Sequence, residues 1–276
     1  MFASRVRRIA QTVRHAPSLR SWTTLWNVVR PAYQRTLGAL ASRNGVEVSI
    51  AGLPIRLSPR FASAAWESIE RESYDAFAKA VGPGDIVYDV GAHIGTYTIL
   101  SLLKSAPDGR VVAYEPVGAT LEFLKRHAQW NGVSGRVIFR PVCCGSESGQ
   151  SLLYFREGEM GGDSGLLPVD GASRTDVRVR KLDSEVAELG IIPTIIKIDV
   201  EGWEWEVLKG AEATLARHHP TIFLSLHPQA LARLGTTAEA VQGWLEQLAY
   251  RHRVIAIDHE IHLLVTSERT TSACNS

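Results

Sequence analysis

The stretch VYDVGAHIGTYT, which runs from Val87 to Thr98, decides the fold of this chain of 276 residues. It has the pattern of a buried strand that leads into a Gly-x-x-x-Gly turn, Gly91 to Gly95, and then into a helix. Glycine allows the backbone to turn tightly and to approach a ligand closely. In open α/β sheets, ligands bind beyond the carboxyl ends of the strands. The stretch therefore predicts a ligand-binding turn at the first strand of an α/β sheet.

The ligand expected at this turn is cationic rather than phosphorylated. The chain has neither the Gly-x-Gly-x-x-Gly spacing of a dinucleotide site nor the Gly-x-x-x-x-Gly-Lys of a phosphate loop. An acid, Asp89, stands at the strand end instead, and it suits a cation or an amino group. S-adenosylmethionine carries a sulfonium and an α-ammonium and no phosphate, so it fits this turn better than NAD does. An oxidoreductase on a related sheet is the weaker alternative.

A second acid follows the next predicted strand. Glu115, in the sequence Tyr114-Glu115-Pro116, lies 20 residues after Gly95. A carboxylate at the end of the second strand can accept hydrogen bonds from both hydroxyls of a ribose. A lone Glu at a strand end is more often only solvated, but the spacing from the glycine turn favours the ribose contact.

A third signal is the sequence IIKIDVEGWE, residues 195–204. The two-residue period of a strand places Lys197 and Asp199 on one face, at the same sheet edge as Asp89. A buried Lys beside an Asp is costly unless the two groups pair with each other or serve a ligand, and both alternatives stay open. DNA amino-methyltransferases would carry Pro-Pro where this chain has Val200-Glu201, so no nucleic-acid partner is expected.

Strand-like and helix-like segments alternate along most of the chain. Strands are expected at 86–90, 110–114, 137–140, 194–199 and 221–226, and helices at 96–103, 119–130, 203–215 and 238–250. The chain closes with an antiparallel pair, 253–258 and 261–265, joined by His259 and Glu260. This alternation is typical of a Rossmann-like α/β fold: a mostly parallel seven-stranded sheet with helices on both faces and an antiparallel last strand.

Three regions are expected: a basic amphipathic helical arm at 1–45, a β-hairpin plus helix at 46–82, and an S-adenosylmethionine-binding domain at 83–276. The smaller elements expected in them are a hairpin of strands 46–50 and 53–57, a helix at 63–80, and an inserted hairpin near 150–182 formed by 151–155 and 176–182. The Gly-rich stretch 158–171 within the inserted hairpin is expected to be a long loop.

The net charge of +1 conceals the basic arm. Residues 1–46 contain eight arginines and no Asp or Glu, which leaves 22 basic against 29 acidic residues in the remainder. Apolar residues recur at helical spacing in the arm, for example at Val6, Ile9 and Val13. Such a helix can dock on the body as a cap, lie on an anionic membrane surface, or serve as an organellar presequence. The sequence leaves these three alternatives open.

Composition places the body among ordinary globular proteins. The chain is 45% hydrophobic and 21% charged, and no apolar run approaches the roughly 20 residues that span a bilayer. Its three cysteines, Cys143, Cys144 and Cys274, do not fit a disulfide framework and favour a reducing compartment. We expect a cytoplasmic protein whose arm, on the membrane alternative, contacts the inner face of the membrane.

Four separated segments together resemble the FkbM-type methyltransferase family. They are 85–98, 114–116, 197–202 (KIDVEG) and 207–211 (VLKGA). The match covers roughly 46–227 and is specific in combination, since all four segments occur in the family's order. The resemblance implies a class I methyltransferase fold. It also implies transfer of a methyl group from S-adenosylmethionine to a hydroxyl oxygen of a small molecule, sugar, glycolipid or polyketide.

The resemblance and the neighbouring residues define the expected cofactor site. Its members are Asp89, Gly91, Ala92, His93, Gly95, Thr98, Glu115, Pro116 and Cys143. Cys143 follows the third strand, near the expected adenine, although with Cys144 it also fits a buried inert pair. One position departs from the family pattern: Ser225 stands on the fifth strand where members usually carry Glu, so no inherited acid role is expected there.

Three residues at strand ends are the catalytic candidates, namely Asp199, His227 and Lys197. A side-chain base, either His227 or Asp199, can remove the hydroxyl proton of the acceptor. Alternatively, a divalent cation held by Asp199 near Glu201 and Glu204 can lower the pKa of that hydroxyl. The metal-free base is favoured and no metal ligands are assigned, because Glu201 and Glu204 open a helix, where the helix dipole alone favours acids.

A different class of function is a binding protein that keeps the fold and the arm but has lost turnover. Such a protein would act as an adaptor on an anionic surface. The joint presence of Asp89, Glu115 and Asp199 favours the enzyme, because an adaptor does not need all three.

Overall fold

A computed structural model describes residues 44–62, 64–66, 68–155, 165–166, 168 and 171–268 of the chain. The predictions for the basic arm, for Cys274 and for most of the loop at 158–171 therefore lie outside the described residues. Within the described part, no helix combines the length and the apolar character that crossing a membrane requires.

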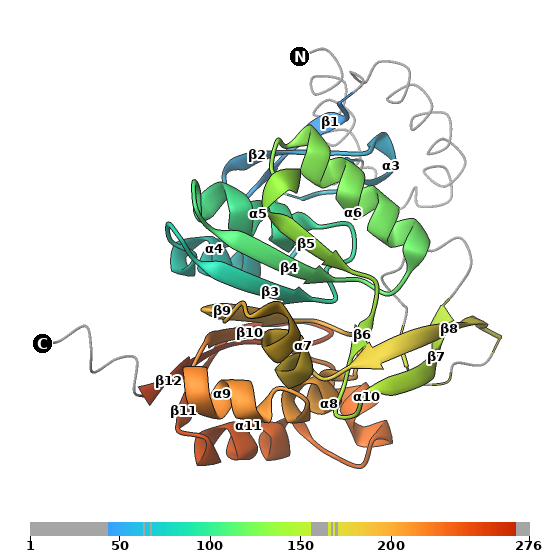
Figure 1. The fold of residues 1–276 in the computed structure, drawn as a ribbon, viewed down its shortest axis with the longest axis vertical. Helices are drawn as coiled ribbons and strands as arrows, with labels where there is room; N and C mark the ends of the chain where they lie inside the picture. Colours follow the sequence, from blue (N-terminus) through green and yellow to red (C-terminus); the bar gives the residue numbers. More distant parts are fainter. Residues whose placement is uncertain are drawn as a thin grey trace, which may run out of the picture.

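The centre of the molecule is a seven-stranded sheet (Figure 1). In spatial order its strands are β11 (Tyr250–Ile257), β12 (Ile261–Ser267), β10 (Thr221–Leu226), β9 (Ile195–Ile198), β3 (Ile86–Val90), β4 (Arg110–Tyr114) and β5 (Val137–Arg140). Strands β5, β4, β3, β9 and β10 are parallel, and β12 is antiparallel to both of its neighbours. The predicted Rossmann-like sheet with its antiparallel last strand is confirmed.

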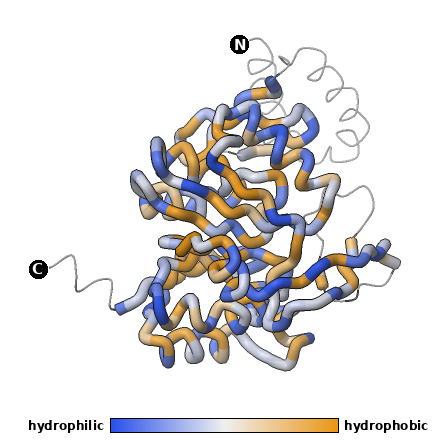
Figure 2. The backbone as a smooth tube through the Cα atoms, in the orientation of Figure 1, coloured by the Kyte–Doolittle hydropathy of each residue, from blue (hydrophilic) through white to orange (hydrophobic). Residues whose placement is uncertain are grey.

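Helices cover both faces of this sheet, and each face has its own apolar core. Strand β3 contributes Val87 to one core, and Tyr88 and Val90 to the other, as the alternation of side chains along a strand requires. One face carries α4 (Arg71–Ala80), α5 (Thr96–Lys104) and α6 (Gly118–Trp130). The other carries α7 (Leu182–Leu189), α8 (Glu204–Lys209), α9 (Glu212–His218), α10 (Pro228–Arg233) and α11 (Ala238–Gln247). The apolar character of the central strands follows from this burial on both sides (Figure 2).

The N-terminal part of the described chain contains the predicted hairpin and a shorter helix than expected. Strands β1 (Val46–Ile50) and β2 (Leu53–Leu57) pair antiparallel over their full length. Of the single helix predicted at 63–80, the part from 71 to 80 is confirmed as α4, whereas the described residues 64–66 and 68–70 are not helical and α3 (Pro59–Ala62) precedes them. Glu70 precedes α4 with φ 44°, in the left-handed region, so the helix cannot extend backwards through it.

The helix predicted at 203–215 is wrong, because the chain breaks there into α8 and α9. The break falls at Gly210, where a Cβ atom would lie 2.1 Å from the carbonyl oxygen of Gly145. Only glycine permits this close approach between the helix end and a distant loop, so a tertiary contact overrides the helical pattern. The helix predicted at 238–250 ends at Gln247, and Tyr250 begins β11 instead.

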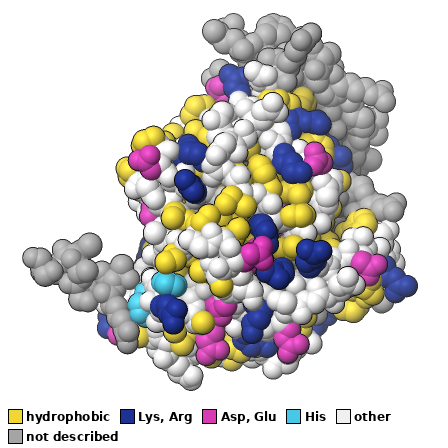
Figure 3. Space-filling view, viewed as in Figure 1, with side chains coloured by type: hydrophobic (Ala, Val, Ile, Leu, Met, Phe, Trp, Pro, Cys, Tyr) yellow, Lys and Arg dark blue, Asp and Glu magenta, His cyan; other side chains and the backbone are white. Residues whose placement is uncertain are grey.

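The inserted hairpin is part of a second, three-stranded sheet. Strand β7 (Gly149–Phe155) pairs antiparallel with β8 (Ser173–Arg180), and β6 (Cys143–Cys144) pairs parallel with β8. The pair β7–β8 projects from the body, and β8 is hydrophilic along much of its length (Figures 1 and 2). Basic and acidic side chains are interspersed on the face drawn in Figure 3. Among the described residues on this face, charges of both signs are therefore mixed.

Candidate active site

A cavity of about 290 Å³ opens at the carboxyl ends of β3, β4 and β9. We call one side of it the loop end, which consists of Gly91, Ala92, His93, Glu115, Pro116 and Cys143. We call the other side the acidic end, which consists of the cavity-lining Asp199, Glu201 and Glu260 together with Glu204 and His227 behind them. The cavity lies at the sheet edge where the sequence analysis expects a site.

Gly91 joins the two ends. It has φ 83°, and a Cβ atom there would lie 1.8 Å from the carbonyl oxygen of Asp199. The N–H groups of Gly91 and Ala92 both donate to the carbonyl oxygen of Tyr114, at 3.1 and 2.9 Å. The turn after β3 is thereby fixed between the chain ends of β4 and β9, and no other residue type fits at its first position.

Three of the predicted cofactor contacts lie behind the cavity wall. The buried Asp89 accepts a hydrogen bond from Thr98 Oγ1 at 2.5 Å. Burial raises the pKa of Asp89 to about 6, against the opposite effects of Thr98 and Lys197. At Gly95 a Cβ atom would meet Leu124 Cγ at 2.9 Å, so this glycine serves the packing of α5 on α6. All three residues support the turn from behind.

Glu115 is held at the loop end by backbone donors. Its two carboxylate oxygens accept from the N–H of His93 at 2.9 Å and from the N–H of Val117 at 2.8 Å. Burial raises the pKa of Glu115 to about 7, partly opposed by these two hydrogen bonds. His93 itself has φ 49°, so the turn presents its N–H to the carboxylate. Each oxygen retains a further lone pair for a ligand hydroxyl.

His127 supports the same turn from α6, and the sequence analysis did not identify it. The ring accepts from the N–H of Ser58 through Nε2 at 2.8 Å, and Nδ1 lies 2.9 Å from the carbonyl oxygen of Ile94. Burial lowers the pKa of His127 to about 4, so the ring is neutral and can donate from Nδ1. The hairpin and the glycine turn are connected through this one side chain.

The thiols near the loop end are protonated. Burial, with a smaller contribution from Glu115, raises the pKa of Cys143 to about 12, and burial also raises that of Cys144. Cys143 and Cys144 both line the cavity, and both are free of disulfides. They contribute apolar surface rather than a nucleophile.

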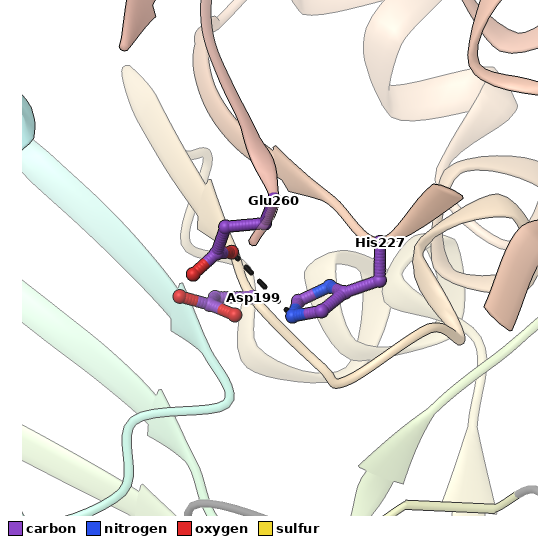
Figure 4. Close-up of side chains that lie close together, drawn as sticks. All are labelled: Asp199, His227 and Glu260. Carbon is purple, nitrogen blue, oxygen red and sulfur yellow. Dashed lines mark ion pairs between the residues drawn. The ribbon is translucent and has the colours of Figure 1, made fainter. Parts of the chain in front are cut away.

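The acidic end depends on the pairing of β10 with β12. In this antiparallel ladder Leu226 is opposite Ile261, so the next step of the register brings His227 beside Glu260. His227 Nε2 lies 3.5 Å from Glu260 Oε2, and both side chains point toward Asp199 (Figure 4). Sheet register therefore brings together residues that are more than thirty positions apart in the chain.

Carboxylates surround His227. Its Nδ1 lies 2.9 Å from Glu204 Oε1, an oxygen that also accepts from the N–H of Gly202 at 2.8 Å. Its Nε2 lies 3.4 Å from Glu201 Oε2. Burial alone would lower the pKa of His227, but Glu204, Asp199 and Glu201 outweigh it and raise the pKa to about 9.

Lys197 and Asp199, which the strand period places on one face, form an ion pair. Lys197 Nζ lies 2.9 Å from Asp199 Oδ2 and 3.3 Å from Ser225 Oγ, and it stands 4.8 Å from the ring centre of Tyr97. Burial would raise the pKa of Asp199, but the charges of Lys197 and His227 outweigh it and hold the pKa below its usual range. Asp199 is thus ionised and reaches the cavity, while Lys197 stays buried behind it.

The neighbouring carboxyl groups hold their protons more tightly. Burial raises the pKa of Glu201 to about 8 and that of Glu260 to about 7, with repulsion from Asp199 adding to both. These shifts follow from several carboxylates sharing one partly enclosed space. Repulsion among these carboxylates therefore opposes full ionisation of the acidic end.

The structure brings most of the predicted site residues together. Gly91, Ala92, His93, Glu115, Pro116, Cys143 and Asp199 line the cavity, whereas Asp89, Gly95, Thr98, Lys197 and His227 stand directly behind its walls. The sequence analysis gave no role to Glu260, nor to the wall formed by Trp66, Glu70, Tyr74, Tyr97 and Trp203. Glu260 could have been found as the acid that precedes an antiparallel strand, because such a strand begins where its parallel neighbours end.

Comparison with known proteins identifies the family. The profile of the methyltransferase FkbM domain matches residues 89–252, which is more than half of the chain. The chain belongs to the FkbM methyltransferase family. The match includes both ends of the cavity except Glu260.

Individual curated methyltransferases are similar to this chain over about half of its length. The hexuronic acid methyltransferase AglP of Haloferax volcanii is 30% identical over 128 residues, which cover 46% of this chain and 49% of that protein. The 31-O-demethyl-FK506 methyltransferase FkbM of Streptomyces tacrolimicus is 28% identical over 158 residues, which cover 47% of this chain and 60% of that protein. The chain thus spans half to three fifths of the length of these curated relatives.

A crystal structure of methyltransferase FkbM from Methylobacillus flagellatus is also similar. It is 17% identical, and the similarity covers 89% of this chain and 60% of that chain with a TM-score of 0.49.

Proposed function

We propose that the protein transfers a methyl group from S-adenosylmethionine to a hydroxyl oxygen of a small molecule, sugar, glycolipid or polyketide. The choice of S-adenosylmethionine as the donor rests on one observation, the charge of the side chains that line the cavity. The described residues that line the cavity include five acids, Glu70, Glu115, Asp199, Glu201 and Glu260, and no Lys or Arg. Such a cavity attracts a sulfonium and an ammonium and repels the phosphates of a dinucleotide.

The proposed orientation of the donor follows from the two ends of the cavity. Glu115 would accept the ribose hydroxyls, and Cys143 and Pro116 would contact the adenine. The methionine part would then pass the Gly91 turn, so that the sulfonium methyl faces the acidic end. The acceptor hydroxyl would enter beside Asp199, between the aromatic wall and Glu260.

The proposed reaction is a direct displacement. The hydroxyl oxygen attacks the methyl carbon, an oxygen–carbon bond forms, and the carbon–sulfur bond breaks with its electron pair left on sulfur. The hydroxyl proton passes to the carboxylate of Asp199, which is ionised and reaches the cavity. His227 is less suited to accept it, because a pKa near 9 leaves the ring protonated at neutral pH in this arrangement.

The choice of acceptor rests on relatives that act on oxygen-rich molecules. AglP is named for a hexuronic acid and the Streptomyces enzyme for a demethylated FK506. The aromatic side chains Trp66, Tyr74 and Tyr97 on the acceptor side of the cavity suit the apolar face of a sugar ring or of a polyketide.

Calorimetry tests the donor. We expect saturable binding of S-adenosylmethionine and none of NAD, since the two ligands differ in charge at the cavity. The proposal would be refuted if the protein bound NAD and did not bind S-adenosylmethionine. Incubation of the enzyme with labelled S-adenosylmethionine and extracts of small molecules and glycans, followed by mass spectrometry, would then identify the product that gains one methyl group.

The basic arm is proposed to contact anionic membranes, and this proposal rests on its eight arginines alone. Full-length protein should sediment with anionic vesicles at low salt and dissociate as salt rises, because exposed charges are screened over about 8 Å at physiological ionic strength. If the protein ignores anionic vesicles even at low salt, the docked cap becomes the better account of the arm.

A further inference from the structure

Three side chains at the acidic end have the geometry of metal ligands. One ligating atom from each of Asp199, His227 and Glu260 lies within 4.8 Å of the other two. They come from three different segments, the end of β9, the end of β10 and the turn before β12, and they converge on one point (Figure 4). Convergence of two carboxylates and an imidazole from separate elements is how proteins build a site for a divalent cation.

Two of these side chains aim polar atoms at that point without a hydrogen-bond partner. Glu260 is 4% exposed, and its Oε2 is buried and accepts no hydrogen bond. His227 Nε2 is also buried and makes no hydrogen bond. The distance between His227 Nε2 and Glu260 Oε2 is 3.5 Å. Buried polar atoms without hydrogen bonds are costly, and a cation between them would satisfy both.

The Nδ1 atom of His227 makes the kind of contact with a carboxylate that metal-binding histidines make. Glu204 Oε1 lies 2.9 Å from Nδ1 and is itself anchored by the N–H of Gly202. A carboxylate that accepts from Nδ1–H fixes the tautomer in which Nε2 carries a free lone pair. Nε2 is the atom that faces Asp199 and Glu260, so the ring is oriented for ligation through it.

The charges of the acidic end also favour a cation. Four carboxylates, Asp199, Glu201, Glu204 and Glu260, share this end, and their ion-pair partners among the described residues are Lys197 and the histidines His227, His259 and His262. A histidine that binds a metal is neutral, so Lys197 is the one permanent cation among these partners. Partly buried carboxylates without compensating charge are unfavourable. A divalent cation would supply most of the missing positive charge in one place.

We infer that Asp199, His227 and Glu260 bind a divalent cation of the Mn²⁺ or Mg²⁺ class. Two carboxylates favour these hard ions over softer metals, and the single imidazole favours Mn²⁺ within the pair. Neighbouring ligands of such an ion stand about 3 Å apart when each bond is about 2.2 Å long. His227 Nε2 and Glu260 Oε2, at 3.5 Å, are close to this spacing.

The use of this site in catalysis rests on the proposed methyl transfer, whereas its existence does not. A cation here stands beside the cavity position proposed for the acceptor hydroxyl. It would hold that oxygen facing the methyl group and favour loss of its proton, which would pass to a neighbouring carboxylate once the charge of the cation has lowered the pKa of that group. Asp199 then serves as a ligand rather than as the base.

Manganese binding tests the inference without any activity assay. Full-length protein stripped with EDTA and desalted is titrated with Mn²⁺, and free Mn²⁺ is followed by electron paramagnetic resonance. We expect one site per chain, with Mg²⁺ as a weaker competitor. Glu260→Gln should lower the affinity at least about tenfold. The control is a Glu–His pair outside the acidic end, in which His252 Nδ1 lies 3.7 Å from Glu246 Oε1. The variants Glu246→Gln and His252→Gln should bind Mn²⁺ like the wild type.

Two outcomes would overturn the inference. The first is a folded wild-type protein that binds neither Mn²⁺ nor Mg²⁺ saturably. The second is a Glu260→Gln variant with wild-type affinity. If that variant does not fold, the wild type alone decides, because a bound cation must raise its Tm with increasing Mn²⁺. Titration of the EDTA-stripped wild type with S-adenosylmethionine is the separate test of the proposed function, because it does not depend on Mn²⁺ binding.

Discussion

The loop end and the acidic end of the cavity are built in opposite ways. At the loop end, backbone N–H groups do most of the positioning: those of His93 and Val117 satisfy both oxygens of Glu115. At the acidic end, side chains face side chains, and Glu260 and His227 retain buried atoms without hydrogen bonds. The first arrangement is complete before a ligand arrives, whereas the second is complete only with a charged partner. The difference implies that the two ends bind separate ligands and can be disabled separately.

Removing the charge of Asp199 should give the largest effect. We expect Asp199→Asn to lower turnover by about 10²–10⁴-fold, because the proton of the acceptor loses its base or its cation. The affinity for S-adenosylmethionine should stay within about threefold, measured by calorimetry. Asp108→Asn, at an exposed turn, is the control and should be fully active. Turnover close to that of the wild type would place the chemistry elsewhere in the cavity.

Substitution of Gly91 should damage both ends at once. Ala at this position meets the carbonyl of Asp199 at 1.8 Å and must adopt φ 83°, so we expect Gly91→Ala to destabilise the fold by about 3 kcal/mol. Chemical denaturation measures this loss. Gly118→Ala has no atom within 4 Å of the new Cβ and should change stability by less than about 0.5 kcal/mol. Equal stability of the two variants would show that the turn relaxes freely.

Substitution of Glu115 should affect binding at the loop end alone. Glu115→Ala is expected to weaken S-adenosylmethionine binding by about 2 kcal/mol, or about thirtyfold, which is the scale of hydrogen bonds to a charged group. Mn²⁺ affinity should not change. Glu122→Ala, an exposed site on α6, is the matched control. Unchanged donor affinity in a folded Glu115→Ala protein would refute the ribose contact.

The smallest effect expected is a dependence of donor binding on pH. The pKa of Glu115 is raised to about 7, mainly by burial, and the ionised form is the one that accepts two hydroxyls. Acidification below pH 7 protonates it, so donor affinity should fall by up to about tenfold per pH unit between pH 7 and pH 5.5. Calorimetry at several pH values measures the slope. Asp89 and the acidic end also titrate, so the part due to Glu115 is the difference between the wild type and Glu115→Gln. Identical slopes in both proteins would contradict this assignment.

The loop end was predictable because its information is local. The stretch 87–98 and the acid at Glu115 lie within one β-α-β unit, and the positions of strand ends follow from the parallel sheet. The sequence could not indicate that Gly95 packs against Leu124, or that Asp89 turns away toward Thr98. These depend on how α5 and α6 pack, which no local pattern encodes.

The acidic end was only half predictable because its information is topological. Asp199 and His227 follow predicted strands and were identified, but Glu260 stood in what looked like a simple turn. Its position depends on β12 pairing with β10, and on the register that sets it opposite His227. Likewise the break at Gly210 coincides with a contact to Gly145, a loop residue that follows β6. Errors of this kind occur where two distant segments meet.

The position of β12 has a consequence for the integrity of the site. Strand β11 is synthesised before β12, yet among the described strands it joins the sheet only through β12. Strand β11 is therefore held in the sheet by β12, and β12 is held in turn by its pairing with β10. Because Glu260 immediately precedes β12, the acidic end is complete only when this C-terminal pair of strands is docked on β10, whereas the loop end depends on β3 and β4.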